Sequence, residues 1–166
     1  MERREFIGSS AMMTLGLAVT GLGGSVAMAA ESEKSASNPL FVSKEAALKY
    51  LPEFAAVAST CSLRGELCTQ HCQLRLAEAD TKFTNCLIAS SQMLILCGAV
   101  GKLAAHKSVR LIETLDSCAA ACKACKTAGE EHKAHWAHGL HMECKACAEQ
   151  CDAMIAAITK LRGLLA

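Results

Sequence analysis

The sequence predicts an all-α protein, an antiparallel up-down-up-down four-helix bundle whose core is lined by cysteine. Apolar residues make up 52% of the chain and aromatic residues only 4%. Alanine, leucine and cysteine supply most of the apolar content, and the β-branched and aromatic runs typical of strands are missing. Four long helical stretches joined by short loops are the pattern of an up-down bundle.

The length and charge of the chain limit its organisation and its partners. It has 166 residues and a formal net charge of +1. This size predicts one folded domain, and the balanced charge gives no electrostatic reason to bind nucleic acid.

The first 29 residues have the features of an export signal. The segment Glu2-Arg3-Arg4-Glu5-Phe6-Ile7 resembles a twin-arginine motif, and Ala27-Met28-Ala29 is a typical cleavage signal, so the mature chain is expected to begin at Ala30. The alternative is a membrane anchor, which five glycines between residues 7 and 27 disfavour. No other stretch is expected to cross a membrane. We therefore expect a periplasmic or otherwise exported protein that folds in the reducing cytosol, where its thiols stay reduced.

The remaining chain divides into a leading segment and the bundle. Residues 30–51 are interpreted as a linker with a short helix between Ser43 and Tyr50, and Pro52 is expected to break that helix and open the next one. Asp80 or Thr81 is suited to cap the second long helix. The bundle is assigned to residues 52–166, with helices expected at about 52–78, 81–102, 108–133 and 139–162.

The cysteines follow a helical spacing. Most are three or four residues from another cysteine, which places their side chains on one face of a helix. Measured from the expected loops near Asp80 and Ala137, they overlap in height and form a rod about 20 Å long at 1.5 Å per residue. We predict that all of them are metal ligands: Cys61, Cys68, Cys72, Cys86, Cys97, Cys118, Cys122, Cys125, Cys144, Cys147 and Cys151.

Thiols at this spacing are compatible with more than one kind of chemistry. Buried structural cysteine is common, but a core with this many small side chains would leave cavities. Disulfides do not suit helical neighbours, and zinc prefers closed four-ligand sites presented by turns. An iron–sulfur cluster motif would end in Cys-Pro, a pair absent from this sequence. Cu(I) fits best, because it is soft and binds thiolates, and bridging thiolates would hold on the order of ten ions per chain.

The second half of the chain carries a family resemblance. The segment Cys118-Ala-Ala-Ala-Cys122-Lys-Ala-Cys125 is followed by several histidines and then by Cys144-Lys-Ala-Cys147-Ala-Glu-Gln-Cys151. This pattern resembles the four-helix-bundle copper storage proteins, in particular their exported, twin-arginine branch. The resemblance implies a Cys-lined bundle filled with Cu(I) and a homo-oligomer. It is weaker in the first two helices, where Gly65, Ser90 and Met93 take places at which a further cysteine would continue the stripe.

Softer and weaker ligands lie near the thiol rod. Met93 falls on the stripe of the second helix and is an accessory thioether candidate. Four residues near the last loop are candidates for a copper entrance or for terminal ligands: His132, His135, His141 and Met142. His71 lies about 100° from its stripe and is expected on the surface, and Met154 is expected to pack.

No catalytic constellation is found in the sequence, so the chain is not expected to be an enzyme. We expect it to sequester Cu(I) for storage or detoxification outside the cytosol, without a membrane partner once the signal is removed. Two alternatives remain open: an iron–sulfur electron carrier, and a copper chaperone that delivers to an exported copper-requiring enzyme.

Overall fold

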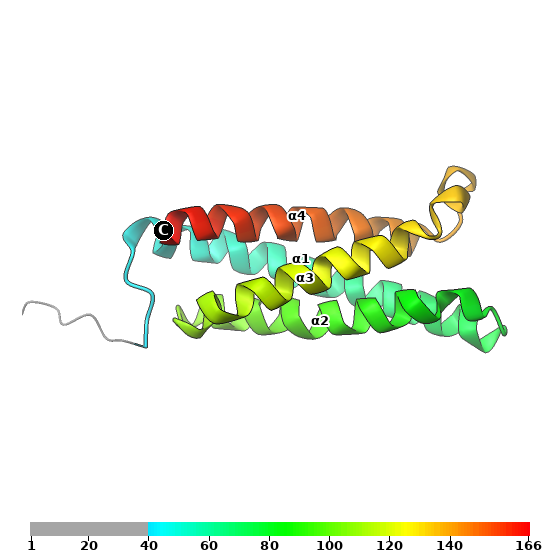
Figure 1. The fold of residues 1–166 in the computed structure, drawn as a ribbon, viewed down its shortest axis with the longest axis horizontal. Coiled ribbons are helices and arrows are strands. Elements are labelled where there is room, and N and C mark those ends of the chain that lie inside the picture. The colour runs from blue at the N-terminus through cyan, green and yellow to red at the C-terminus, as the bar shows by residue number, and fades with distance from the viewer. Residues whose placement is uncertain (1–39) are drawn as a thin grey trace, which may run out of the picture. The chain divides into compact units, whose positions relative to one another are not determined.

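The computed structural model describes residues 40–166. The expected signal and most of the expected linker lie outside the described residues. Four long helices lie side by side (Figure 1), and short 3₁₀ helices at Thr81–Phe83 and Lys133–His138 lie in two of the connections. The helices are α1 (Glu45–Ala77), α2 (Thr84–Ala105), α3 (Arg110–Glu130) and α4 (Met142–Leu165).

The four helices form a bundle of the expected kind. α1 packs against α2 and α4, and α3 packs against the same two helices, so each helix has two main neighbours. Consecutive helices are joined by short connections and run in opposite directions (Figure 1). The described residues contain no strand, only one isolated bridge between Phe41 and Ser108. The prediction of an all-α bundle is confirmed.

The helix break expected at Pro52 is wrong. α1 is continuous from Glu45 to Ala77, with Pro52 inside it. Pro52 is exposed, whereas Tyr50, Leu51 and Phe54 on either side of it are buried. Burial of each such side chain contributes about 1.5–3 kcal/mol, and together they outweigh the roughly 3 kcal/mol that an interior proline costs. The first turns of α1 therefore belong to the bundle.

The helix ends differ from the expected ones by a few residues for local reasons. The Asp80 carboxylate accepts a hydrogen bond from the Lys82 backbone N–H at 3.3 Å, so it caps the 3₁₀ helix, and α2 begins only at Thr84. α4 begins at Met142, not near Gly139, because Gly139 and His141 have left-handed backbones with φ of 69° and 56°.

The bundle core has two chemically different parts. The end that holds the start of α1 and the end of α4 is filled by large apolar side chains, among them Phe54, Leu111, Leu115, Ile158 and Leu161. The segment before α1 lies beside the α2–α3 connection there, since the Val42 N–H donates to the Lys107 carbonyl at 2.8 Å. The rest of the core is lined by the cysteines, and this part ends at the α1–α2 and α3–α4 connections.

One prediction about membranes needs correction. Within residues 40–166, the segment Thr81–Ala105 is long and apolar enough to cross a membrane by length and composition, with a mean hydropathy of 1.6. It contains α2, which packs between α1 and α3 and carries Cys86, Met93 and Cys97 into the core. Its apolar character comes from this buried face together with exposed residues such as Ile88 and Ile95.

Candidate metal centre

Every cysteine of the chain points into the bundle. All eleven are buried and none forms a disulfide. They come from all four helices: Cys61, Cys68 and Cys72 from α1, Cys86 and Cys97 from α2, Cys118, Cys122 and Cys125 from α3, and Cys144, Cys147 and Cys151 from α4. The cysteines of each helix therefore share its core-facing side, as their three- and four-residue spacing predicted, and the four stripes face one another.

Ten of the eleven sulfur atoms form three groups, in each of which all sulfurs lie within 4.8 Å of one another. Nearest the α3–α4 connection, the Cys68, Cys86 and Cys144 sulfurs are 3.6–3.9 Å apart. The groups are Cys68, Cys72, Cys86 and Cys144; Cys125, Cys147 and Cys151; and Cys61, Cys97 and Cys122.

The three groups are joined into one network. Cys97 lies 3.7 Å from both Cys118 and Cys122, so the eleventh thiol is attached to the last group. Cys125 and Cys147 are 3.5 Å apart. Cys147 lies near enough to Cys68, and Cys151 near enough to Cys61, to affect the pKa of each, so the middle group lies next to both outer ones. The result is a continuous column of sulfur along the bundle axis.

A thioether occupies the gap in the α1 and α2 stripes. The Met93 sulfur lies 3.4 Å from the Cys61 sulfur, and Met93 is fully buried. Its methyl group fills the space beside Gly65, where an added Cβ would come within 2.8 Å of it. Gly65 thus leaves room for Met93 in this position, and the methionine lies among the thiols as the sequence predicted. Ser90 instead turns away and bonds to Thr69 at 3.1 Å.

The thiols influence one another's protonation. Donation from Cys118 lowers the pKa of Cys122 to about 5, and donation from Cys147 lowers the pKa of Cys125 to about 5. The pKa of Cys118 is raised to about 12, chiefly by Cys122. Since neighbouring S–H groups stabilise particular thiolates, the column is prepared to exchange protons for metal cations.

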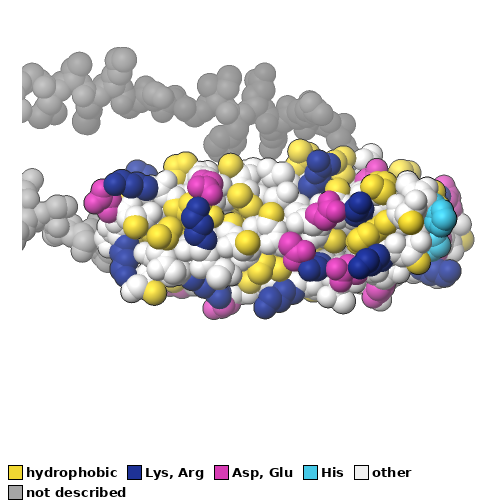
Figure 2. Space-filling model, turned by 90° about the horizontal axis from the view of Figure 1, so that it is seen from above, with side chains coloured by type: hydrophobic (Ala, Val, Ile, Leu, Met, Phe, Trp, Pro, Cys, Tyr) yellow, Lys and Arg dark blue, Asp and Glu magenta, His cyan; other side chains and the backbone are white. Residues whose placement is uncertain are grey.

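Histidines gather at the end of the column. Figure 2 shows them together at one end of the bundle. His71 Nε2 lies 3.1 Å from His141 Nδ1, and the His132 and His135 rings lie 5.8 and 5.4 Å from the His141 ring. Phe83 lies among them and stacks on His132 at 4.0 Å between ring centroids. We call His71, His132, His135 and His141 the histidine cap.

Burial distinguishes the members of the histidine cap. His132 is buried, and its Nε2 has no hydrogen-bond partner. Burial lowers the pKa of His132, and burial together with His71 lowers the pKa of His141. Both rings are therefore favoured as neutral imidazoles, the form that binds metal.

One sequence interpretation of this region is wrong. His71 was expected on the surface, but it is only 19% exposed and contacts His141 and Phe83. Its place on the last turns of α1 brings it to the start of α4, although it lies off the cysteine stripe. Met142 is 40% exposed and lines a groove with Arg64 and Leu67 on the outside of the bundle, and its role at a copper entrance stays a prediction.

The sulfur geometry limits what the site can hold. Contacts of 3.5–3.9 Å leave room for single ions between sulfurs, but not for a cluster that contains iron and inorganic sulfide. The four-cysteine group could accept a tetrahedral ion, since metal–sulfur bonds of about 2.3 Å separate sulfurs by just under 4 Å. A continuous column of soft ligands, however, is best suited to several soft cations that share thiolates.

Comparison with known proteins agrees with this geometry. The family model for copper storage proteins matches residues 49–156, a span that contains all eleven cysteines. No curated protein matches the chain. A match over this much of the chain, with every thiol directed into one bundle core, shows that the protein belongs to the copper storage protein family.

Proposed function

We propose that the chain binds and stores several Cu(I) ions through cysteine thiolates inside the bundle, on the order of ten per chain if thiolates are shared. The observation that carries this proposal is the set of eleven buried thiols in one core, in which six pairs of sulfurs lie 3.5–3.9 Å apart. Met93 is placed to act as an accessory thioether ligand.

The proposal is tested by titrating the reduced protein with Cu(I) under anaerobic conditions and counting bound copper by elemental analysis. We expect well over four ions per chain. Saturation at one or two ions would favour a chaperone, and iron with acid-labile sulfide in the purified protein would favour an electron carrier. Parallel titration with Zn(II) should stop at a lower number, because zinc prefers four ligands for each ion.

A storage or detoxification role fits the site better than catalysis. The thiols are buried and leave little space for a substrate beside a fully sulfur-ligated ion. Delivery to an exported copper-requiring enzyme is compatible with storage, but a chaperone needs only one exposed site. We infer a non-enzymatic protein that acts outside the cytosol. Support for export comes from the twin-arginine-like segment at Arg3 and Arg4 and from the benefit of folding before the thiols meet an oxidant. Fractionation of cells that produce the full chain tests the location.

The histidine cap is the proposed copper entrance. It lies at the end of the column where the four-cysteine group begins, whereas the opposite end is closed by Phe54, Leu115 and Leu161. Imidazole binds Cu(I) less strongly than thiolate, so it suits transfer more than retention. Replacing His71, His132 and His141 by Gln should slow loading from a Cu(I)-chelator complex without changing the final number of ions by more than about two. The matched control is His106→Gln in the α2–α3 connection, and equal loading rates for the two proteins would refute this role.

A homo-oligomer is a further proposal. A groove of about 600 Å³ between α2 and α3 is lined by Ile95, Leu96, Ala121 and Ala124, and Ile95 is 67% exposed. A second copy of the chain would cover this apolar surface. Light scattering of the protein should show an oligomer that Ile95→Lys dissociates, and a monomer at all concentrations would overturn the proposal.

A further inference from the structure

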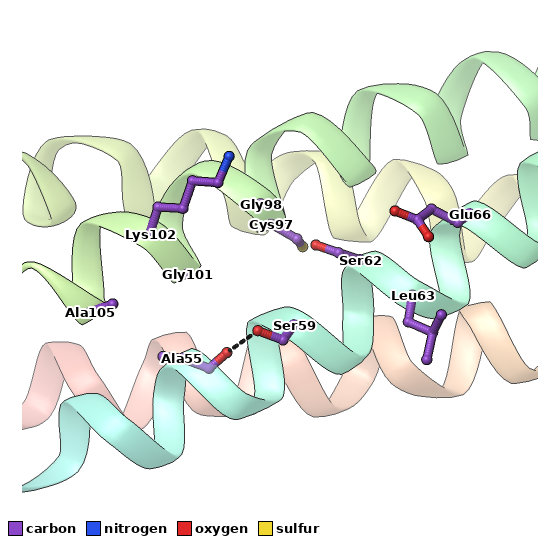
Figure 3. Close-up of a pocket in the computed structure, with 10 residues that line it drawn as sticks. All are labelled: Ala55, Ser59, Ser62, Leu63, Glu66, Cys97, Gly98, Gly101, Lys102 and Ala105. Carbon is purple, nitrogen blue, oxygen red and sulfur yellow. Dashed lines mark hydrogen bonds between the residues drawn. The ribbon is translucent and has the colours of Figure 1, made fainter.

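The side of the bundle has an opening that reaches the thiol column. A groove of about 420 Å³ runs between α1 and α2, and Cys97 forms part of its wall (Figure 3). Three other grooves on the described residues have walls without a cysteine. Cys97 is itself fully buried and contacts both Cys118 and Cys122. The column is therefore close to the surface at this sulfur, far from the histidine cap along the bundle.

The Ser62 side chain lies near this thiol in the wall of the groove. Figure 3 shows the side chains of Ser62 and Cys97 directed toward one another across the groove. The Ser62 hydroxyl is buried and has no hydrogen-bond partner. Its neighbours Ser59 and Thr60 instead donate to the backbone carbonyls four residues earlier, at 2.9 and 3.0 Å. The Ser62 hydroxyl therefore has unused hydrogen-bonding capacity beside the groove.

Two glycines form part of the α2 wall of the groove. Gly98 and Gly101 face α1 with no side chain, and an added Cβ at Gly98 would meet only the Ser62 hydroxyl, at 3.9 Å. Lys102 and Glu66 are both exposed and lie on either side of the Ser62–Cys97 pair along the groove (Figure 3). The groove thus presents one positive and one negative charge around a polar centre.

From these features we propose that the α1–α2 groove is a second copper-exchange site, at which a small zwitterionic thiol carrying Cu(I) reaches Cys97 past Ser62. Lys102 would bind the carboxylate of the carrier and Glu66 its amino group, while Ser62 would bond to a polar atom near its sulfur. This inference rests on the proposed storage function. This second site differs from the histidine cap because it serves the thiols around Cys97, which lie farther from the histidine end of the bundle.

The exchange is a ligand substitution without oxidation or reduction. The Cys97 sulfur forms a bond to Cu(I) as the bond between copper and the carrier sulfur breaks. The proton of the Cys97 thiol goes to the departing carrier thiolate. Cys118 and Cys122, each 3.7 Å away, can then share the ion and pass it into the column.

Residue-specific alkylation of the metal-free protein tests access directly. Folded protein is treated with iodoacetamide under reducing-agent-free anaerobic conditions, and each modified cysteine is quantified by mass spectrometry. Cys118 and Cys122 are internal references because they are equally buried and lie in the same group. Because the three thiols are equally buried and only Cys97 lines the groove, faster modification of Cys97 would report access through it.

We expect Cys97 to react at least about fivefold faster than either reference, whereas reaction through global unfolding would give no such preference by position. Gly98→Leu should fill the groove and abolish the preference, while the matched variant Gly98→Ala should keep it. Equal reaction of the three thiols, or a preference that survives Gly98→Leu, would overturn the proposal. A maleimide attached to a large polymer should not reach Cys97 in either case, and rapid labelling by it would also overturn the proposal.

Copper loading provides the second measurement. With a Cu(I)–glutathione complex as donor, Gly98→Leu should load at least about threefold more slowly than Gly98→Ala and reach the same final copper content, because only the route is changed. Equal rates would overturn the role in exchange. A low copper capacity of the unmodified protein would instead refute the storage function, and the alkylation of Cys97, which needs no copper, would still decide whether the groove gives access.

Discussion

Replacing Cys118 and Cys122 together by Ala measures whether thiolates are shared between ions. Both sulfurs lie 3.7 Å from Cys97, and Cys122 belongs to the same group as Cys61 and Cys97. If each ion used two thiols of its own, the chain would hold about five ions and this pair would account for one. If each thiolate bridges two ions, the number of ions approaches the number of thiols, and the pair accounts for about two or more.

The assay is an anaerobic Cu(I) titration of the double variant beside the unmodified protein, with copper and protein measured in the same samples. We expect a loss of at least two ions and a column that still fills elsewhere. Removing a buried sulfur atom costs about 1 kcal/mol of stability for each site, so the far-ultraviolet circular dichroism of the variant should stay helical. The variant Met154→Leu controls for changes in core packing, because Met154 is fully buried but does not belong to a cysteine group. An unchanged capacity would refute ligation by Cys118 and Cys122, and a loss of one ion would refute sharing.

Three further variants test the thioether, the histidine cap and the proline in α1. Met93→Leu removes the thioether that lies 3.4 Å from the Cys61 sulfur but keeps the bulk of the side chain. It should lower the number of bound Cu(I) ions by about one or less and leave the fold intact. A loss of several ions in the titration would contradict an accessory role. Burial holds the pKa of His132 below 6.5, so as the pH falls the unfolded state binds a proton before the folded state does. The thermal midpoint of the metal-free protein should therefore fall as the pH drops below about 6.5 and level off below the pKa of the folded state. His132→Gln should flatten this slope in calorimetry, and an equal slope in the variant would assign the pH dependence to other groups. Pro52→Ala should raise the denaturation midpoint of the metal-free protein by an amount equivalent to about 1–3 kcal/mol, because alanine restores a backbone donor for the Leu48 carbonyl inside α1. An unchanged midpoint would mean that α1 accommodates the proline without a cost in stability.

The helical period accounts for most of what the sequence predicts about the core. Cysteines three and four residues apart must share a face, and in a bundle that face is the interior. The stripes of α3 and α4 therefore meet, and Cys125 and Cys147 come within 3.5 Å of each other. Periodicity does not determine the contacts across helices, because these depend on how far each helix is shifted along its neighbour. The packing of Met93 beside Gly65 is a contact of this type.

The errors at Pro52 and His71 have a common physical origin. Pro52 reads as a break and His71 as a surface residue if each helix is considered alone. In the bundle, burial of Tyr50, Leu51 and Phe54 keeps α1 continuous through Pro52. The left-handed residues before α4 place His141 against His71. Both outcomes arise from tertiary packing, which local propensity does not contain.

The division of the core into an apolar end and a thiol column separates folding from metal binding. Phe54, Val100, Leu115 and Leu161, one from each helix, can hold the four helices together without any ion, because burial of each stabilises the fold by about 1.5–3 kcal/mol. Metal ions then enter a column whose sulfurs are already adjacent, and little binding free energy is used to order the chain. A bundle that depended on copper to fold would bind its first ions cooperatively and release them only by unfolding. A preformed bundle can fill and empty in steps, and this behaviour is what a storage protein requires.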